Sequence, residues 1–199
     1  MTWGEIQIES LKKMFLNNSE LKVSELQNYL NDKKYKTYLY AMPQACNEAI
    51  NYICNQLPIT TKMYELEKDE ESDYYDLTNI LDDFSKLSDV IAPSNENIKW
   101  EMVSRNILHI TNWKNEPLQL LYESRPDNIT INTRNNTEID LPLEYATLIP
   151  LYIAGELYKD DDLSLATMYM NEFMSMINGY INGNEIFSNP TIKTIYSIE

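Results

Sequence analysis

Glycine, cysteine and histidine are scarce in this chain of 199 residues, which holds four, two and one of them respectively. So few glycines leave no Gly-rich loop that could cradle a phosphate group. No serine or cysteine stands in a motif typical of a nucleophile, and no cysteine–histidine spacing is typical of zinc. The sequence therefore predicts no catalytic residue, no cofactor and no metal site.

Basic residues are outnumbered by acidic residues, and long apolar runs are lacking. The chain has 16 Lys and Arg against 31 Asp and Glu, for a net charge of -15. Neutralising the phosphates of duplex nucleic acid needs clustered Lys and Arg, so this balance argues against sequence-specific nucleic-acid binding. No run approaches the roughly 18 apolar residues of a membrane span, so no membrane partner is expected. The one dense basic spot, formed by Lys33, Lys34 and Lys36, is predicted to be a solvated helix face or turn.

The two cysteines, Cys46 and Cys54, are separated by eight positions in a predicted helix. That separation is about 12 Å of helical rise, which is more than a disulfide can span. We therefore expect two free, buried thiols in a reducing compartment.

Residues 141–177 are the most informative stretch, because they predict two helical segments joined by an acidic turn. The first segment, 143–158, is apolar on nearly every side and must be covered by its own domain or by a neighbour. The second places a stripe on one helix face, consisting of Leu163, Ala166, Met170, Phe173 and Ile177. Either these helices close a core, which the residues alone favour, or part of their surface is a subunit interface. Further apolar area comes from Tyr152, Tyr158, Met168, Tyr169 and Met176.

The remaining elements follow from caps and periodicity. A capping box at Thr2 and Glu5 opens a helix to about residue 17, a short helix covers 24–30, and a longer helix covers about 36–56. Pro43 predicts a start or kink in that longer helix. Residues 77–90 predict a short helical turn, and Gly179 is the expected end of the last helix. Alternating or β-prone runs predict strands of an antiparallel meander at 61–66, 98–102, 107–111, 118–122 and 129–133.

Helices followed by strands and then helices predict an α+β fold. We expect a helical bundle built from both chain ends, with an inserted antiparallel β region and an extended C-terminal tail. The expected parts are the N-terminal helices at 1–56, a β-rich insertion at 57–140, a C-terminal helical pair at 141–179 that packs on the N-terminal helices, and the tail at 180–199.

Acidic residues and the single histidine are the only candidates for chemistry. Asp160, Asp161 and Asp162 are predicted to serve a helix N-terminus, since three consecutive side chains in a turn point in different directions. The acidic loop at 68–76 lacks the ligand pattern of a calcium loop. His109 is predicted on a strand, facing away from Leu108 and Ile110. Two alternatives stay open: a metal-dependent hydrolase that uses acidic residues, and an intracellular regulatory binding module.

Several segments resemble the head–tail connector proteins of tailed bacteriophages, which are also called adaptor or head-completion neck proteins. LIPLYIAGELYKDDD (148–162), followed by LATMYMNEF (165–173), is similar to the C-terminal helical pair of that family. TWGEIQIESLKKMF (2–15) resembles its first helix, and YDLTNILDDF (75–84) resembles the entry to its β region. The likeness is spread over most of the chain, and its motifs are structural.

This resemblance implies a structural virion protein without enzymatic activity, located in the neck of the particle and made in the host cytoplasm. The implied partners are the portal protein, downstream neck or tail proteins, and identical subunits in a ring through which DNA passes. A subunit interface is expected at Tyr152, Tyr158, Met168 and Tyr169. The tail is expected to lie as a strand or extended segment against the portal or another neighbouring chain, with pockets filled by Ile192, Ile195, Tyr196 and Ile198.

Overall fold

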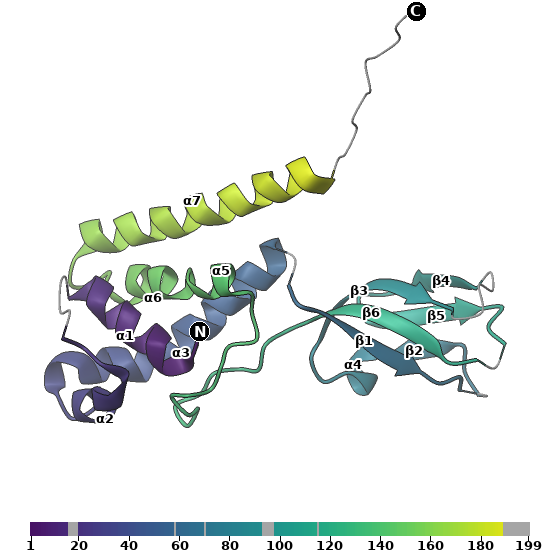
Figure 1. Cartoon of the computed structure of the whole chain (residues 1–199), viewed down its shortest axis with the longest axis horizontal. Helices are drawn as coiled ribbons and strands as arrows, with labels where there is room; N and C mark the ends of the chain where they lie inside the picture. Colours follow the sequence, from purple (N-terminus) through teal and green to yellow (C-terminus); the bar gives the residue numbers. More distant parts are fainter. Residues whose placement is uncertain (16–19, 58, 70, 93–97, 115, 189–199) are drawn as a thin grey trace, which may run out of the picture. The chain divides into compact units, whose positions relative to one another are not determined.

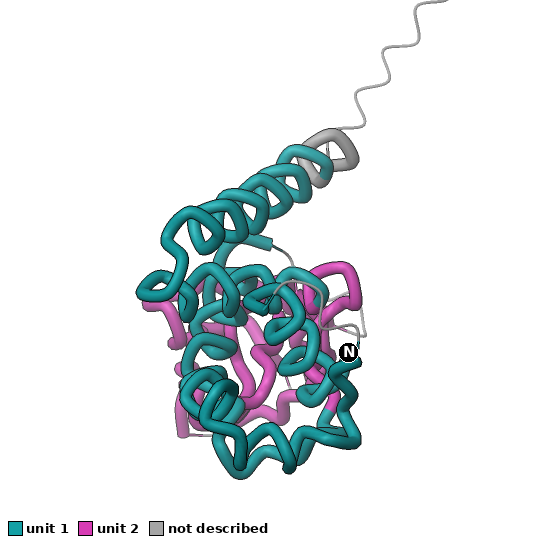
Figure 2. The backbone as a smooth tube through the Cα atoms, turned by 90° about the vertical axis from the view of Figure 1, so that its left-hand side faces the viewer, with its two compact units in different colours: residues 1–57, 129–137, 147–199 teal, residues 58–128, 138–146 magenta. Residues whose placement is uncertain are grey.

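A computed structural model describes residues 1–15, 20–57, 59–69, 71–92, 98–114 and 116–188, which form two compact units (Figures 1 and 2). The helical unit consists of Met1–Leu57, Ile129–Thr137 and Thr147–Glu199. The β unit consists of Pro58–Asn128 and Glu138–Ala146. The predicted fold class is confirmed: helices from both chain ends pack together, and antiparallel sheets are inserted between them.

The helical unit begins with the predicted capping box of α1 (Trp3–Met14). The Glu5 N–H donates to Thr2 Oγ1 at 3.3 Å, and the Thr2 N–H donates to Glu5 Oε2 at 2.8 Å. These bonds satisfy main-chain donors that the first helical turn leaves open. The other helices of this unit are the 3-10 helix Val23–Glu25, α2 (Leu26–Tyr29), α3 (Lys33–Gln56), α6 (Ile149–Leu157) and α7 (Leu163–Ser188).

The long helix α3 starts at Lys33, with Asp32 as its N-cap, and contains Pro43 in its interior. A helix start at Pro43 is therefore wrong. The buried face of α3 holds the helix together across the missing hydrogen bond, because tertiary packing outweighs local propensity. Cys46 and Cys54 are buried on this helix and are not joined in a disulfide, as predicted, and burial raises the pKa of the Cys46 thiol to about 12.

The apolar segment 143–158 forms two helices and not one. The first, α5 (Leu143–Ala146), belongs to the β unit, and α6 starts anew at Ile149 in the helical unit. Pro150 lies in the first turn of α6, where main-chain N–H groups have no acceptor within the helix. The N–H group that proline lacks therefore costs no helical hydrogen bond. The proline therefore begins the second helix.

The β unit is a small sandwich of two three-stranded antiparallel sheets, ordered β1-β6-β3 and β2-β5-β4. Alternate side chains of both sheets enter one core, which includes Leu118 and Leu120 of β6 and Leu108 and Ile110 of β5. The short α4 (Leu77–Ile80) contributes Leu77 to the same core. The strands are β1 (Thr61–Leu66), β2 (Tyr74–Asp76), β3 (Phe84–Ile91), β4 (Lys99–Met102), β5 (Ile107–Thr111) and β6 (Leu118–Ser124).

The predicted meander is wrong, because the consecutive strands β5 and β6 lie in different sheets. Two facing sheets bury an inner face each, which a single meander in one sheet cannot do. Strand β3 was also not predicted from the sequence. Register shifts between Phe84 and Lys86 and between Leu87 and Asp89 interrupt the alternation of apolar and polar residues along this strand.

The predicted strand at 129–133 is wrong as well. Residues 129–137 form loop and turns that belong to the helical unit, although we expected them inside the β-rich insertion. The Ile129 N–H donates to Asn47 Oδ1 and Asn47 Nδ2 donates to the Ile129 carbonyl, both at 2.8 Å. At the other end of this segment, the Gly4 N–H donates to the Asn135 carbonyl at 2.8 Å. Side-chain and main-chain partners on α3 and α1 thus replace a strand partner.

The last helix does not end at Gly179, since α7 continues to Ser188. Glycine inside a helix costs only about 1 kcal/mol relative to alanine, so it does not stop a helix by itself. The expected tail at 180–199 is therefore helical up to Ser188. The tail residues Ile192, Ile195, Tyr196 and Ile198 lie outside the described residues.

Candidate interaction surfaces

Helix α6 is the centre of the helical unit, and α1, α3 and α7 of the same unit pack around it. Its buried residues include Ile149, Leu151, Ile153 and Ala154. At Gly155 a Cβ atom would lie 3.1 Å from the Met170 main-chain nitrogen and 3.2 Å from the Ala166 carbonyl oxygen. Glycine thus permits the close approach of α6 and α7. The all-round apolar character of α6 is satisfied within its own unit.

Helix α7 buries most of the predicted stripe. Ala166, Phe173 and Ile177 are buried and Met170 is half-buried, whereas Leu163, in the first turn of the helix, is 67% exposed. The Phe173 ring packs against Tyr52 of α3 and Tyr152 of α6, with ring centroids 5.5 and 5.2 Å apart. This aromatic group joins three helices and accounts for much of the apolar area that the sequence displays.

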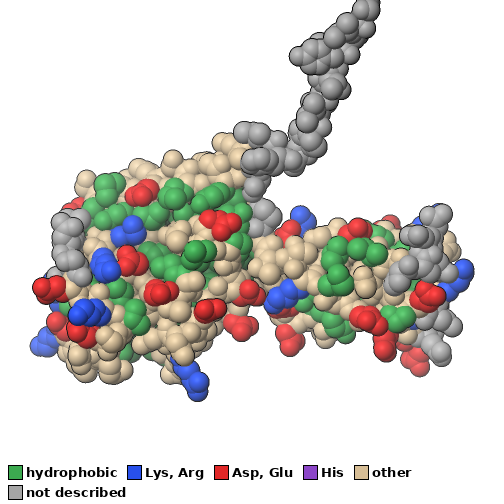
Figure 3. All heavy atoms as spheres, in the orientation of Figure 1, with side chains coloured by type: hydrophobic (Ala, Val, Ile, Leu, Met, Phe, Trp, Pro, Cys, Tyr) green, Lys and Arg blue, Asp and Glu red, His purple; other side chains and the backbone are tan. Residues whose placement is uncertain are grey.

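The four residues expected at a subunit interface have different surroundings. Tyr169 is buried, and its hydroxyl donates to the Lys13 carbonyl at 2.9 Å. Tyr152 and Tyr158 are half-buried in contacts within the helical unit, whereas Met168 is 49% exposed. Interface formation stays a prediction, and Met168 is the member of this set with the most available surface. Figure 3 shows hydrophobic side chains gathered along α7 on the face that it draws.

A second aromatic group lies where α1 ends, α3 begins and α6 ends. The Phe15 ring makes edge contacts with Tyr35, Tyr38 and Tyr158, at centroid distances of 5.0, 5.3 and 5.8 Å. The Lys34 ammonium lies 4.8 Å from the Phe15 ring centroid, so the predicted basic spot is a solvated helix start with a cation–π contact. These tyrosines serve packing inside the unit.

Two aspartates of the acidic turn before α7, Asp161 and Asp162, accept hydrogen bonds within the helical unit. Asp162 Oδ1 accepts from the Leu165 N–H at 2.9 Å, as predicted for an N-cap. Asp161 accepts from the Tyr38 hydroxyl, and burial together with this hydrogen bond raises the pKa of Tyr38. Within the described part of the chain, no three or more His, Cys, Asp or Glu side chains are grouped to hold a metal ion.

His109 lies on β5 and faces away from the buried Leu108 and Ile110, as predicted. Its ring stacks on Tyr74 of β2, with centroids 4.4 Å apart and planes 9° from parallel. Its Nδ1 lies 3.3 Å from Glu101 Oε1 on β4. A shallow hollow of about 190 Å³ beside it is lined by Lys99, Trp100, Glu101, His109 and Thr111. This arrangement is a cross-strand contact on a sheet surface.

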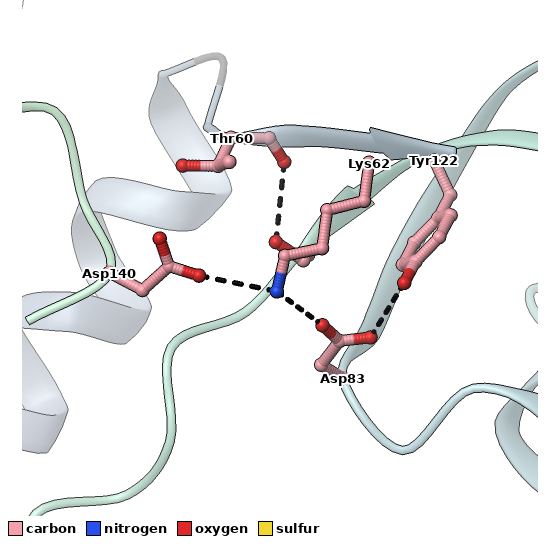
Figure 4. A network of polar contacts seen from close by, with 6 residues as sticks. Thr60, Lys62, Asp83, Tyr122 and Asp140 are labelled. Carbon is pink, nitrogen blue, oxygen red and sulfur yellow. Dashed lines mark hydrogen bonds and ion pairs between the residues drawn. The ribbon is translucent and has the colours of Figure 1, made fainter. Parts of the chain in front are cut away.

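The β unit contains a polar network around Lys62 and Asp83, which the periodicity of the sequence did not predict (Figure 4). Lys62 Nζ lies 2.8 Å from Asp83 Oδ2 and 3.2 Å from Asp140 Oδ2. The Tyr122 hydroxyl donates to the other oxygen of Asp83 at 3.0 Å. Burial opposes ionisation of Asp83, but the hydrogen bonds from Lys62 and Tyr122 outweigh it and lower the Asp83 pKa. The network joins β1, β6, the loop before β3 and the segment 138–146.

No helix in the described residues is long and apolar enough to cross a bilayer. The chain matches no known family model and no curated protein.

Proposed function

We propose that this protein is a structural head–tail connector subunit of a tailed bacteriophage, which acts by forming interfaces and carries out no chemistry. One observation carries the proposal: helices from both chain ends form one unit that carries an inserted β unit. That is the arrangement which the resemblance of residues 2–15, 75–84 and 148–173 to connector proteins implies. In this role, identical subunits form a ring that joins the portal to the tail or to the next neck ring.

Surface features of α7 support this proposal. Met168 and Met176 on this helix are 49% and 39% exposed, and Leu163 at its start is 67% exposed. Flexible methionine side chains adapt well to a partner surface. Contacts between different faces of identical subunits close into a ring when the rotation between subunits allows it.

The test is co-expression with the portal protein from the same genome, followed by size analysis and electron microscopy. We expect a complex in which this chain forms a ring on the portal. The double variant Met168→Glu with Met176→Glu should weaken that complex if α7 is part of an interface, because it places charge on apolar contact area. Val103→Glu, at a 57% exposed position in the β unit, is the matched control. A chain that stays monomeric and does not bind the portal would contradict the proposal.

A further inference from the structure

The edge strands of the sandwich differ in how well they are protected against further pairing. An unprotected edge offers unpaired main-chain groups to another strand, and short edges or bulges reduce that tendency. Of the outer strands, β2 has three residues, β4 has four, and β3 has two register shifts. In contrast, β1 has six residues in unbroken register with β6, from Thr61 opposite Glu123 to Leu66 opposite Leu118. Among the described strands, β1 is thus the longest edge without a register shift.

The side chains at this edge favour a strand partner. Met63 and Tyr64 of β1 are 60% and 37% exposed, which leaves apolar surface on both faces of the strand. The ammonium of Lys62, a residue type that commonly protects edges, is instead directed to Asp83 and Asp140.

A groove of about 400 Å³ lies beside the end of β1. Its apolar walls are Tyr64, Leu66, Tyr75 and Ile80, and its acidic members are Glu65, Glu67 and Asp69. A strand added to β1 would therefore find main-chain partners along the edge, an apolar pocket and negative charge. Strand addition of this kind draws affinity from main-chain bonds and specificity from such pockets.

We infer that the occupant of the β1 edge is the C-terminal segment 191–198 of a second copy of this chain. That segment, TIKTIYSI, is rich in β-branched and aromatic residues and carries Lys193 to complement the acidic groove. Eight residues in a strand span about 26 Å, enough to cover the roughly 20 Å of a six-residue strand. The segment lies outside the described residues, one residue from the end of the chain. This inference rests on the ring assembly of the proposed function and names the contact between its subunits.

The contact is heterologous, because the edge and the tail are different surfaces of the same chain. It therefore predicts complementation between two full-length variants. Glu65→Lys with Glu67→Lys reverses the charge of the groove and keeps the tail, whereas Ile195→Pro prevents strand pairing in the tail and keeps the edge. Each variant alone should self-associate at least tenfold more weakly than the natural chain in sedimentation experiments. An equimolar mixture should form a heterodimer and nothing larger.

Hydrogen exchange is a second measurement of the contact at β1. A change in solubility caused by the altered charges would not slow amide exchange in this strand. In the assembled natural chain, amide exchange within residues 62–65 should be at least tenfold slower than in the Ile195→Pro variant, and exchange within β3 should be equal in both. Ile91→Lys, on the bulged opposite edge of the same sheet, should leave self-association unchanged. Thermal unfolding of every variant verifies that it is folded.

Unchanged self-association of the Ile195→Pro variant, absence of the heterodimer, or a natural chain that remains monomeric in isolation would each overturn this inference. Portal binding is measured in parallel and separates the two proposals. A natural chain that binds the portal but shows no β1 protection retains the connector function and lacks this subunit contact. Failure of the natural chain to bind the portal would contradict the proposed function itself.

Discussion

Asp83 is the residue on which the polar network of the β unit depends, because it accepts hydrogen bonds from both Lys62 and Tyr122. We predict that Asp83→Ala lowers the free energy of unfolding by about 1–3 kcal/mol, since the buried Tyr122 hydroxyl loses its acceptor. Urea unfolding measures the change. Asp140→Ala is the control and should cost about 0–1 kcal/mol, because its side chain is 52% exposed. Equal effects of the two substitutions would contradict this account.

The same residue predicts a pH dependence. The Asp83 pKa is lower in the folded chain than its ordinary value of 3.8. Ionised Asp83 therefore contributes fully to the free energy of unfolding above pH 3.8, and this contribution is lost as the pH falls through the lowered pKa of the folded chain. The Lys62 pKa is raised, chiefly by the hydrogen bond to Asp83, so the Lys62 contribution is lost only at high pH, above its ordinary value of 10.5. The difference in unfolding free energy between the natural chain and Asp83→Asn should therefore stay constant at higher pH and shrink as the pH falls below the ordinary value of 3.8. A constant difference would show that ionisation of Asp83 does not matter.

Asp162 acts through a single capping bond to the Leu165 N–H. Asp162→Ala should lower the unfolding free energy by about 1 kcal/mol, because a main-chain donor of α7 loses its partner. Asp160→Ala, at an exposed position in the same turn, should change it by less than about 0.5 kcal/mol. Replacing Asp160 and Asp161 together by Asn should leave assembly intact. Tight magnesium, manganese or calcium binding that disappears in these variants would instead favour the hydrolase alternative.

At the scale of elements, the two glycines Gly155 and Gly179 lie in helices but have different surroundings. A side chain at Gly155 would press on the main chain of α7, whereas nothing lies within 4 Å of a Cβ at Gly179. We predict that Gly155→Val lowers the unfolding free energy by about 1–3 kcal/mol through overpacking. Gly179→Ala should raise helix stability by up to about 1 kcal/mol. Thermal and urea unfolding test both, and a neutral Gly155→Val would mean that α6 and α7 separate easily.

At the scale of the whole molecule, the described residues end at Ser188, and eleven positions of the sequence follow it. Truncation after Ser188 keeps α7 whole, and we predict that it leaves the melting temperature nearly unchanged while weakening assembly. Ordering a free segment costs roughly 1–2 kcal/mol per residue, which a partner surface must offset. Calorimetry and sedimentation of the truncated chain measure the two effects. A truncated chain that unfolds would show that 189–199 belongs to the core of its own subunit.

Local signals accounted for much of what the sequence predicted correctly. The capping box at Thr2 and Glu5, the cap at Asp162 and the alternation around His109 each depend on residues within a few positions of one another. The spacing of Cys46 and Cys54 excluded a disulfide in the same local way. Such features follow from main-chain geometry, which the surrounding fold does not change.

The errors arose where a distant partner decided the outcome. The pairing of β6 with β1 and β3 depends on contacts between strands far apart in the chain. Asn47 holds the 129–137 segment against the helical unit, although that segment is β-prone by sequence. The Lys62 network joins four segments that no periodicity connects, so its existence could not be derived from the sequence.

By itself, the sequence determined the α+β class, most element positions, the absence of a disulfide between Cys46 and Cys54, and the helix caps at Thr2 and Asp162, because these depend on composition, periodicity and short-range bonds. Only the tertiary structure decided that α6 is enclosed by its own unit, that the β region is a sandwich, and that β1 is an outer strand in unbroken register with β6. These properties depend on which buried surfaces meet across long sequence separations. Surface available for a partner is what remains after that internal packing, and it therefore requires the folded molecule.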